Sequence, residues 1–396
     1  MPSPPQPLDA IRAVDGVLTV PVPARLTERT VPELDARLVW DDVVEAIFDF
    51  AGCGFISSAG IRCVLAAHHR MRESGGRVRV TNLAGDVAGV FEVTGLANIL
   101  HLEHVGAAER PTREISIDGI EPFSAGVCGE CFRIGPEKIV KLYRDGVSPA
   151  VAEQEKRLAR KAFIMGIPTA ISFDMVSCRG RVGVEYEMLD AELFSEVIRR
   201  EPDDVERYAE MLVEVVGKVH AVGDDLGDLP VLRDRIRDNI ESVRGDLPDA
   251  DVDLLQARLA AVPGEECCVH FDLHSSNIML RRGRPIIIDM GDLSRGSPWF
   301  DVAVVFMIYG VPELGLCELA TGIPTEHGLR LWEAFKRRYL ADRPEGDREY
   351  LEQHGHFLAA LRLLCAFEIA PTRKQDFIAM IRDVLLPRMK SPPRLG

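Results

Sequence analysis

The sequence predicts two domains, an N-terminal α/β domain with a mixed sheet covered by helices and a larger C-terminal α+β domain of two lobes. Three observations predict this division. Strand-like and helix-like stretches alternate over the first 110 residues. The polar stretch GAAERPTRE at 106–114 then has the composition of a linker. Beyond it, short strands come first, and long helical patterns dominate from about Asp190 onward.

The N-terminal alternation is visible element by element. Residues 16–23 alternate apolar and polar positions as a strand does, and residues 30–40 predict a short helix with Pro32 in its first turn. The remaining elements are a buried strand at 43–50, an amphipathic helix at 59–76 ended by glycines, a strand at 77–83 and a helical segment at 86–100.

The C-terminal part begins with strands and continues with helices. Its clearest segments are strands at 114–123, 131–144 and 181–189 and helices at 204–222 and 251–262. The segment HFDLHSSNIMLRRGRPIIIDMGD at 270–292 interrupts the helices and predicts a loop, a strand, a turn and a second strand.

Composition limits the kinds of partner and compartment. With 46% apolar and 28% charged residues the chain has the balance of a globular protein, and only its ends, 1–11 and 391–396, are expected to be flexible. The net charge of −15 argues against a nucleic-acid-binding face. No apolar run reaches the length of a membrane span, and the start MPSPPQPLDA lacks a signal peptide's apolar centre, so we expect no membrane partner and a cytoplasmic location.

Nine cysteines include one C-x-x-C pair, Cys128 and Cys131. A zinc site would need a second such pair, which the sequence lacks. Small residues in a tight turn are therefore the preferred interpretation.

The hairpin at 270–292 carries the residues expected to do chemistry. Folding it brings Asn277, at the start of the first strand, beside Asp289, at the end of the second, with Asp272 on the preceding loop. Amide and carboxylate oxygens suit Mg²⁺, and a further carboxylate can orient or deprotonate a hydroxyl group. Phosphoryl transfer needs both.

The order H-x-D-x-x-x-x-N followed by I-D resembles the aminoglycoside phosphotransferase and choline kinase-like superfamily, which has a bilobal protein kinase-like fold. The resemblance implies a domain at 113–390, with a small lobe at 113–187 and a helical large lobe at 188–390. It makes Asp272 the catalytic base, and Asn277 and Asp289 the Mg²⁺ ligands. Two histidines, His270 and His274, would support the loop.

One position departs from the family pattern, and two others are left open. The family usually has Gly where this chain has Phe271, which bears on the geometry of the loop rather than on metal binding. Asp292 is interpreted as a turn residue outside the metal site. A metallohydrolase ligand set of His270, Asp272 and His274 remains an alternative, although only His354 and His356 among the other histidines are close in sequence.

In the small lobe the resemblance implies a strand lysine for the nucleotide phosphates and a helix carboxylate that holds it. Lys141 lies mid-strand, while Lys138 is nearer the turn. Glu155 stands where the family's pairing glutamate does, with Glu153 as the alternative because the helix phase is not known from sequence.

Two further segments of the small lobe are expected to contact the nucleotide. Gly126 and Gly129 lie in a turn where backbone N–H groups can approach phosphate. The segment VEYEMLD resembles the hinge, where the backbone of Glu187 and Met188 would meet the base.

These residues predict an ATP-dependent phosphotransferase that acts on a hydroxyl group of a small molecule or a protein. The alternative is a partner-switching signalling protein whose kinase-like domain is a nucleotide sensor or scaffold.

The core FISSAGIR at 55–62 resembles the STAS domains, the anti-sigma factor antagonists. The resemblance covers about residues 12–105 and implies a domain at 12–110. The resemblance implies a regulatory domain, an anti-sigma factor or other signalling partner, and phosphorylation at Ser58, which begins a helix whose dipole favours added phosphate. Many relatives have Asp before this serine, and this chain has Ser57. A plain helix-capping role for Ser58 is the alternative.

Overall fold

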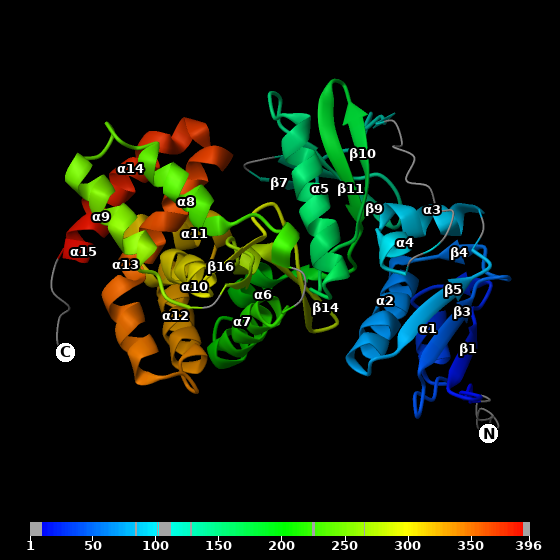
Figure 1. The fold of residues 1–396 in the computed structure, drawn as a ribbon. Coiled ribbons are helices and arrows are strands. Elements are labelled where there is room, and N and C mark those ends of the chain that lie inside the picture. Colours follow the sequence, from blue (N-terminus) through cyan, green and yellow to red (C-terminus); the bar gives the residue numbers. More distant parts are fainter. Residues whose placement is uncertain are drawn as a thin grey trace. The chain divides into compact units, whose positions relative to one another are not determined.

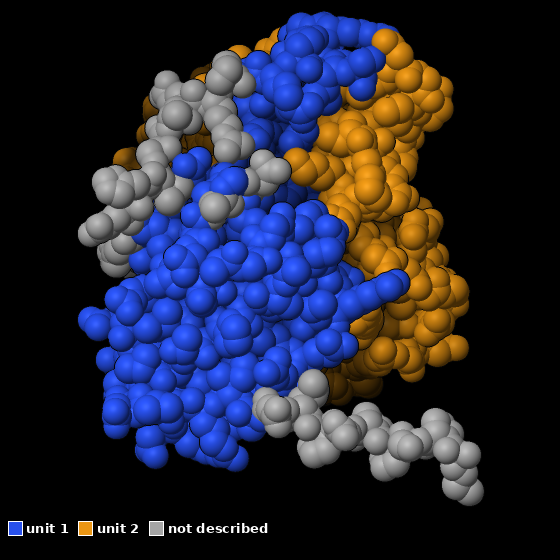
Figure 2. Space-filling model, turned by 90° about the vertical axis from the view of Figure 1, so that its right-hand side faces the viewer, with its two compact units in different colours: residues 1–116, 171–187 blue, residues 117–170, 188–396 orange. Residues whose placement is uncertain are grey.

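The structure is a computed structural model that describes residues 10–83, 85–100, 102, 112–126, 129–223, 226–264 and 266–390. The two predicted flexible ends (apart from residues 10 and 11), most of the predicted linker, and Cys128 lie outside the described residues. The chain packs as two compact units (Figure 2): residues 1–116 with 171–187, and residues 117–170 with 188–396.

A parallel sheet forms the core of the first unit. Strands β1 (Val17–Pro21), β3 (Glu45–Asp49) and β5 (Arg77–Thr81) pair in the order β1-β3-β5, with Val17 opposite Glu45 and Glu45 opposite Arg77. Inward positions such as Ala46 and Phe48 are fully buried, as strand alternation requires. A second parallel pair joins β2 (Arg25–Leu26) to β4 (Phe55–Ile56).

Helix α2 (Ser58–Glu73) packs against β3 and β5 (Figure 1). Its close approach to β2 depends on Gly60, because a Cβ atom there would lie 2.7 Å from the Leu26 carbonyl oxygen. The remaining helices of this part are α1 (Thr30–Asp35), α3 (Gly85–Val93) and α4 (Leu96–Ile99).

The first unit also contains a hairpin from the middle of the chain. Strands β10 (Ser172–Cys178) and β11 (Arg181–Glu187) pair antiparallel, and β6 (Arg113–Glu114) runs parallel to β10. Residues 171–187 therefore pack with the N-terminal residues, although the sequence assigns them to the small lobe.

The second unit begins with three antiparallel strands. Strand β8 (Gly129–Arg133) pairs with both β7 (Ser124–Ala125) and β9 (Lys138–Tyr143). Helix α5 (Pro149–Ile164) follows, and its N-cap Ser148 accepts a hydrogen bond from the N–H of Ala150.

The rest of the second unit is mainly helical (Figure 1). The described α-helices are α6 (Phe194–Arg200), α7 (Val205–His220), α8 (Leu232–Glu241), α9 (Asp249–Ala260), α10 (Trp299–Val305), α11 (Leu316–Thr321), α12 (Thr325–Tyr339), α13 (Glu345–Ile369), α14 (Lys374–Met380) and α15 (Leu386–Lys390). Helix α13 packs against α8, α10 and α15. Within the described part of the chain, no helix combines the length and apolar character needed to cross a membrane.

The predicted hairpin is present within this helical part. Strands β14 (Ile278–Arg281) and β15 (Arg284–Ile287) pair with Ile278 opposite Ile287. The two turn residues, Arg282 and Gly283, have φ of 51° and 76°, the geometry that suits a tight hairpin. Strand β12 (Glu192–Leu193) pairs with β14, and β13 (Cys267–Val269) pairs with β16 (Ser294–Gly296).

Candidate active site

Strand β9 and helix α5 bring a lysine and a glutamate together. The Lys141 ammonium donates to Glu155 Oε1 at 2.8 Å and lies 3.3 Å from Asp289 Oδ2. The Tyr143 hydroxyl donates to the other oxygen, Glu155 Oε2, at 2.5 Å. Glu155 is 6% exposed, whereas Glu153 faces solvent, so the phase of α5 favours the first of the two predicted carboxylates.

The charge of Lys141 is stabilised by its two carboxylate neighbours. Burial alone would lower the pKa of Lys141, but Asp289 and Glu155 outweigh it and raise this pKa well above its usual value. Lys141 therefore stays an ammonium ion at neutral pH, as a group that binds phosphate oxygens must.

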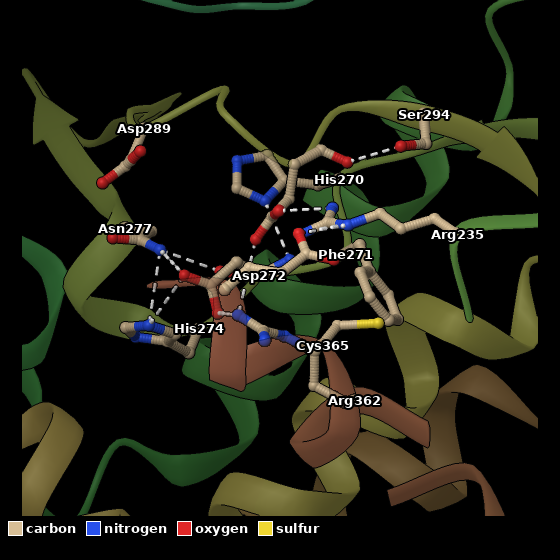
Figure 3. Close-up of polar contacts among 12 residues, drawn as sticks. Arg235, His270, Phe271, Asp272, His274, Asn277, Asp289, Ser294, Arg362 and Cys365 are labelled. Carbon is tan, nitrogen blue, oxygen red and sulfur yellow. Dashed lines mark hydrogen bonds and ion pairs between the residues drawn. The ribbon is translucent and has the colours of Figure 1, made fainter. Parts of the chain in front are cut away.

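Asp272 lies in the loop between β13 and β14 and is held by both carboxylate oxygens (Figure 3). Arg362 donates to Oδ1 at 2.6 Å, and the Asn277 amide donates to Oδ2 at 3.0 Å and to the Asp272 carbonyl oxygen at 2.9 Å. The carboxylate is thus fixed in one orientation, with 27% of its side chain exposed.

The pKa of Asp272 follows from this surrounding. Burial acts to raise the pKa of Asp272, but the Arg362 guanidinium lowers it well below its usual value. A carboxylate this weakly basic orients a hydroxyl group by accepting its hydrogen bond. It takes up the proton only when that group has become strongly acidic.

Two histidines bond to the backbone of the same loop. His270 Nδ1 accepts from the Asp272 N–H at 3.2 Å, and His274 Nδ1 accepts from the Ser276 N–H at 3.3 Å. Burial lowers the pKa of His274, so its ring is neutral and able to accept this bond.

Phe271 adopts the backbone conformation that usually requires glycine. Its φ is +62°, in the left-handed region that favours glycine. The strain is offset by full burial: the ring packs edge-on against Phe300 at 6.1 Å, and the Arg362 guanidinium lies 5.3 Å above it. Asp301, fully buried at the start of α10, also accepts from the Phe271 N–H at 2.6 Å.

Asn277 and Asp289 end up next to each other on the hairpin. The Asn277 carbonyl accepts from the Ile288 N–H at 2.9 Å, which sets Asp289 one residue beyond the pair. The Asn277 amide nitrogen faces Asp272, which leaves its oxygen on the side of Asp289 (Figure 3). The Asp289 side chain is 45% exposed. One carboxylate and one amide oxygen at a solvent-accessible edge fit Mg²⁺, which completes its shell with waters and phosphate oxygens.

Protein side chains alone form no metal site in the part of the chain that the structure describes. Among the described residues, no group of three or more His, Cys, Asp or Glu side chains is arranged to hold a metal ion. The two other histidines that are close in sequence pack against aromatic rings. The ring centroids of His354 and Tyr350 are 4.6 Å apart, and those of His356 and Phe306 are 5.2 Å apart. These contacts give no support to the metallohydrolase alternative.

Three backbone N–H groups that were predicted to contact the nucleotide donate hydrogen bonds within the chain. The Gly126 N–H donates to the Gly129 carbonyl at 2.8 Å, and the Met188 N–H donates to the Glu137 carbonyl at 2.9 Å. The Glu187 N–H donates to the Ile171 carbonyl at 2.9 Å. These three N–H groups are therefore satisfied before any nucleotide binds.

Gly129 has a packing reason for being glycine. A Cβ atom there would lie 2.4 Å from the Leu142 carbonyl oxygen of the neighbouring strand. The residue allows β8 and β9 to pair closely, which is a structural role.

Sequence reasoning missed the arginines behind Asp272. Arg362, 5% exposed on α13, also lies 3.5 Å from Asp292. Asp292 accepts in turn from Arg235 at 2.6 Å, so it is part of an ion-pair network rather than a plain turn residue. The available signal was a single charge inside an apolar run, Arg362 in FLAALRLLCAF and Asp301 in WFDVAVV, because such a charge needs a partner.

Ser58 is the first residue of α2 in the first unit, where Ser57 holds the N-cap position without a side-chain capping bond. The Ser58 hydroxyl donates instead to Glu187 Oε1 at 2.7 Å. The capping role considered for Ser58 is therefore wrong.

Comparison with known protein families identifies both parts of the chain. Residues 119–344, more than half of the sequence, match the family described as "Phosphotransferase enzyme family". The chain belongs to this phosphotransferase family. Residues 10–108 match the STAS domain, so a STAS domain precedes the phosphotransferase domain. No curated protein matches the chain.

Several solved structures resemble this phosphotransferase. The crystal structure of aminoglycoside phosphotransferase APH(4)-Ia is 15% identical, with a TM-score of 0.50, and the match covers 69% of this chain and 94% of that one. A choline/ethanolamine kinase family protein from Mesorhizobium loti is 14% identical, with a TM-score of 0.45, over 74% of this chain and 96% of its own. An aminoglycoside phosphotransferase from Streptomyces rimosus, in complex with ADP and streptomycin, is 19% identical, with a TM-score of 0.42, over 68% and 98%. At these identities the likeness concerns the fold alone.

Proposed function

We propose that this phosphotransferase uses ATP with Mg²⁺ and transfers the γ-phosphoryl group to a hydroxyl group of a small molecule or a protein, with its STAS domain regulating the enzyme or recruiting a partner. The observation that carries the proposal is the pairing of Lys141 with Glu155 in the same unit as the Asp272–Asn277 loop. The Lys141–Glu155 pair alone, or the Asp272–Asn277 loop alone, could have a purely structural explanation. Together they supply the charge and the orienting group that phosphoryl transfer requires.

Lys141 is the proposed ligand of the nucleotide phosphates. Glu155 holds its ammonium at 2.8 Å and is itself fixed by Tyr143, so the charge is oriented before the nucleotide arrives. Asn277 and Asp289 would hold Mg²⁺, which supplies positive charge to the phosphate oxygens. The Asp289 carboxylate lies 3.3 Å from Lys141, so a metal ion held by Asp289 would add its charge beside that of the lysine.

Asp272 is the proposed acceptor-orienting residue. The hydroxyl oxygen of the acceptor forms the new bond to phosphorus as the bond from the γ-phosphorus to the oxygen of ADP breaks. The hydroxyl proton passes to the Asp272 carboxylate. A lowered pKa suits a loose transition state, in which the hydroxyl proton is lost late and positioning matters more than basicity.

A transfer assay tests the proposal. Purified chain is incubated with Mg²⁺ and γ-labelled ATP against a panel of amino alcohols, sugars and protein acceptors, including the chain itself. We expect label on at least one hydroxyl-bearing acceptor, and none when Mg²⁺ is chelated. Nucleotide binding without transfer to any acceptor would favour the other function considered, a partner-switching protein with a nucleotide-sensing domain.

A further inference from the structure

The end of strand β11 carries a carboxylate that the STAS domain holds. Glu187 is 4% exposed, and its side chain bonds to Ser58, Arg62 and Ile171 of the first unit. Ser58 Oγ donates to Oε1 at 2.7 Å, and Arg62 donates to Oε1 at 2.9 Å and to Oε2 at 2.5 Å. The Ile171 N–H also reaches Oε2, at 3.4 Å.

This arrangement has the properties of a specific contact rather than a surface ion pair. Ser58 and Arg62 are four residues apart on α2, so they lie on one helix face. The guanidinium engages both carboxylate oxygens, which is the strong, directional form of the interaction. A carboxylate buried to this degree is stable only while such partners remain.

The contact joins residues of the two family segments. Glu187 ends β11 and belongs to the matched phosphotransferase segment, while Ser58 and Arg62 belong to the matched STAS segment. The two family segments therefore meet, within one compact unit, at this carboxylate.

We propose that Ser58 and Arg62 form an intrachain latch on Glu187, and that negative charge at Ser58 opens it. The occupant of this end of α2 is thus the chain's own β11. A phosphate on Ser58 would bring close to two negative charges against a buried carboxylate and would remove the hydroxyl donor. A protein partner that binds this end of α2 must likewise displace β11. The inference goes beyond the proposed phosphotransferase activity and does not depend on it.

Hydrogen exchange of the full chain, without nucleotide or acceptor, tests the latch. In Ser58→Asp we expect amide exchange in residues 58–65 and at 171–172 to be about tenfold faster than in wild type, because a charge-assisted contact is lost. Ser74→Asp is the matched control. It adds the same charge at the exposed C-terminal end of the same helix, and its exchange at 171–172 should equal that of wild type.

Reversing both charges of the Arg62–Glu187 pair distinguishes loss of this contact from general misfolding of a variant. Arg62→Glu and Glu187→Arg should each accelerate exchange in the same segments, and the double variant should return it toward wild type because the ion pair is rebuilt with reversed polarity. Wild-type exchange in Ser58→Asp overturns the proposal. So does a double variant that exchanges as fast as the single variants. If these exchange results support the latch but the wild-type chain transfers no phosphoryl group to any acceptor, the proposed function is refuted and the latch is not.

Discussion

Replacing Arg362 with methionine is expected to destabilise the second unit and to change how its stability depends on pH. The guanidinium is 5% exposed and lies 2.6 Å from Asp272 and 3.5 Å from Asp292. Methionine keeps much of the volume but removes the charge. Asp292 retains Arg235 at 2.6 Å, so Asp272 is the carboxylate that loses its principal partner.

The magnitude follows from the burial of the pair. Breaking a buried ion pair from one side costs about 3 kcal/mol at the low end of the usual range, and the low end applies because Asp272 keeps some contact with solvent. At about 2–4 °C per kcal/mol for a unit of this size, Arg362→Met should melt about 6–12 °C below wild type at pH 7.

The pH dependence has a definite sign. The folded-state pKa of Asp272 is lowered, so its ionisation contributes stability that is present at neutral pH and is lost as pH falls below its unfolded value of about 4. In Arg362→Met the guanidinium no longer opposes the effect of burial, so the folded-state pKa of Asp272 rises. The variant therefore has less of this stability to lose at low pH. The gap between the two melting temperatures should therefore stay nearly constant from pH 7 to about pH 5 and narrow as pH falls below about 4.

Thermal unfolding followed by circular dichroism at about pH 7, 4 and 3 measures this, because the Asp272 contribution is lost below about pH 4. Arg348→Met is the control, since Arg348 lies on the same helix, is 43% exposed and is only 3.8 Å from Glu345. An exposed pair of this kind contributes about 0–1 kcal/mol. If the two variants melt together at pH 7, or the gap does not change with pH, the Arg362–Asp272 reasoning is refuted.

Three further substitutions test other parts of the account. Asp289→Ala should abolish the Mg²⁺ dependence of nucleotide binding measured by calorimetry, and an unchanged dependence would remove Asp289 from the proposed metal site. Glu155→Gln should weaken nucleotide binding roughly tenfold through loss of a charged hydrogen bond to Lys141, whereas Glu153→Gln, on the exposed face of the same helix, should bind as wild type does. Phe271→Gly relieves about 1–2 kcal/mol of left-handed strain but forfeits about 3–5 kcal/mol of aromatic packing, so chemical denaturation should give a net loss of stability; a more stable variant would show that the strain dominates.

The sequence was most informative where chemistry depends on local spacing. The interval from Asp272 to Asn277 and the hairpin that follows predicted which side chains come together, because a two-residue turn sets the strand register. The choice between Glu153 and Glu155 needed the helix phase, which depends on how α5 packs.

Contacts between distant segments were beyond sequence reasoning. Arg362 reaches Asp272 across 90 positions, and Ser58 reaches Glu187 across 129. No periodicity encodes such a pair, although a lone arginine in an apolar run indicates that a partner exists. The same limit applies to Gly126, whose N–H appeared available in sequence but closes its own turn.

The most direct test of the proposed mechanism is phosphoryl transfer by Asp272→Asn, with nucleotide affinity measured on the same preparation. The amide keeps the shape of the side chain but cannot take up the acceptor's proton. We expect ATP to bind as it does to wild type, and single-turnover transfer to fall by about 10² or more, the loss typical of removing a general base. Transfer at the wild-type rate would contradict the account, because another residue would then have to accept the proton.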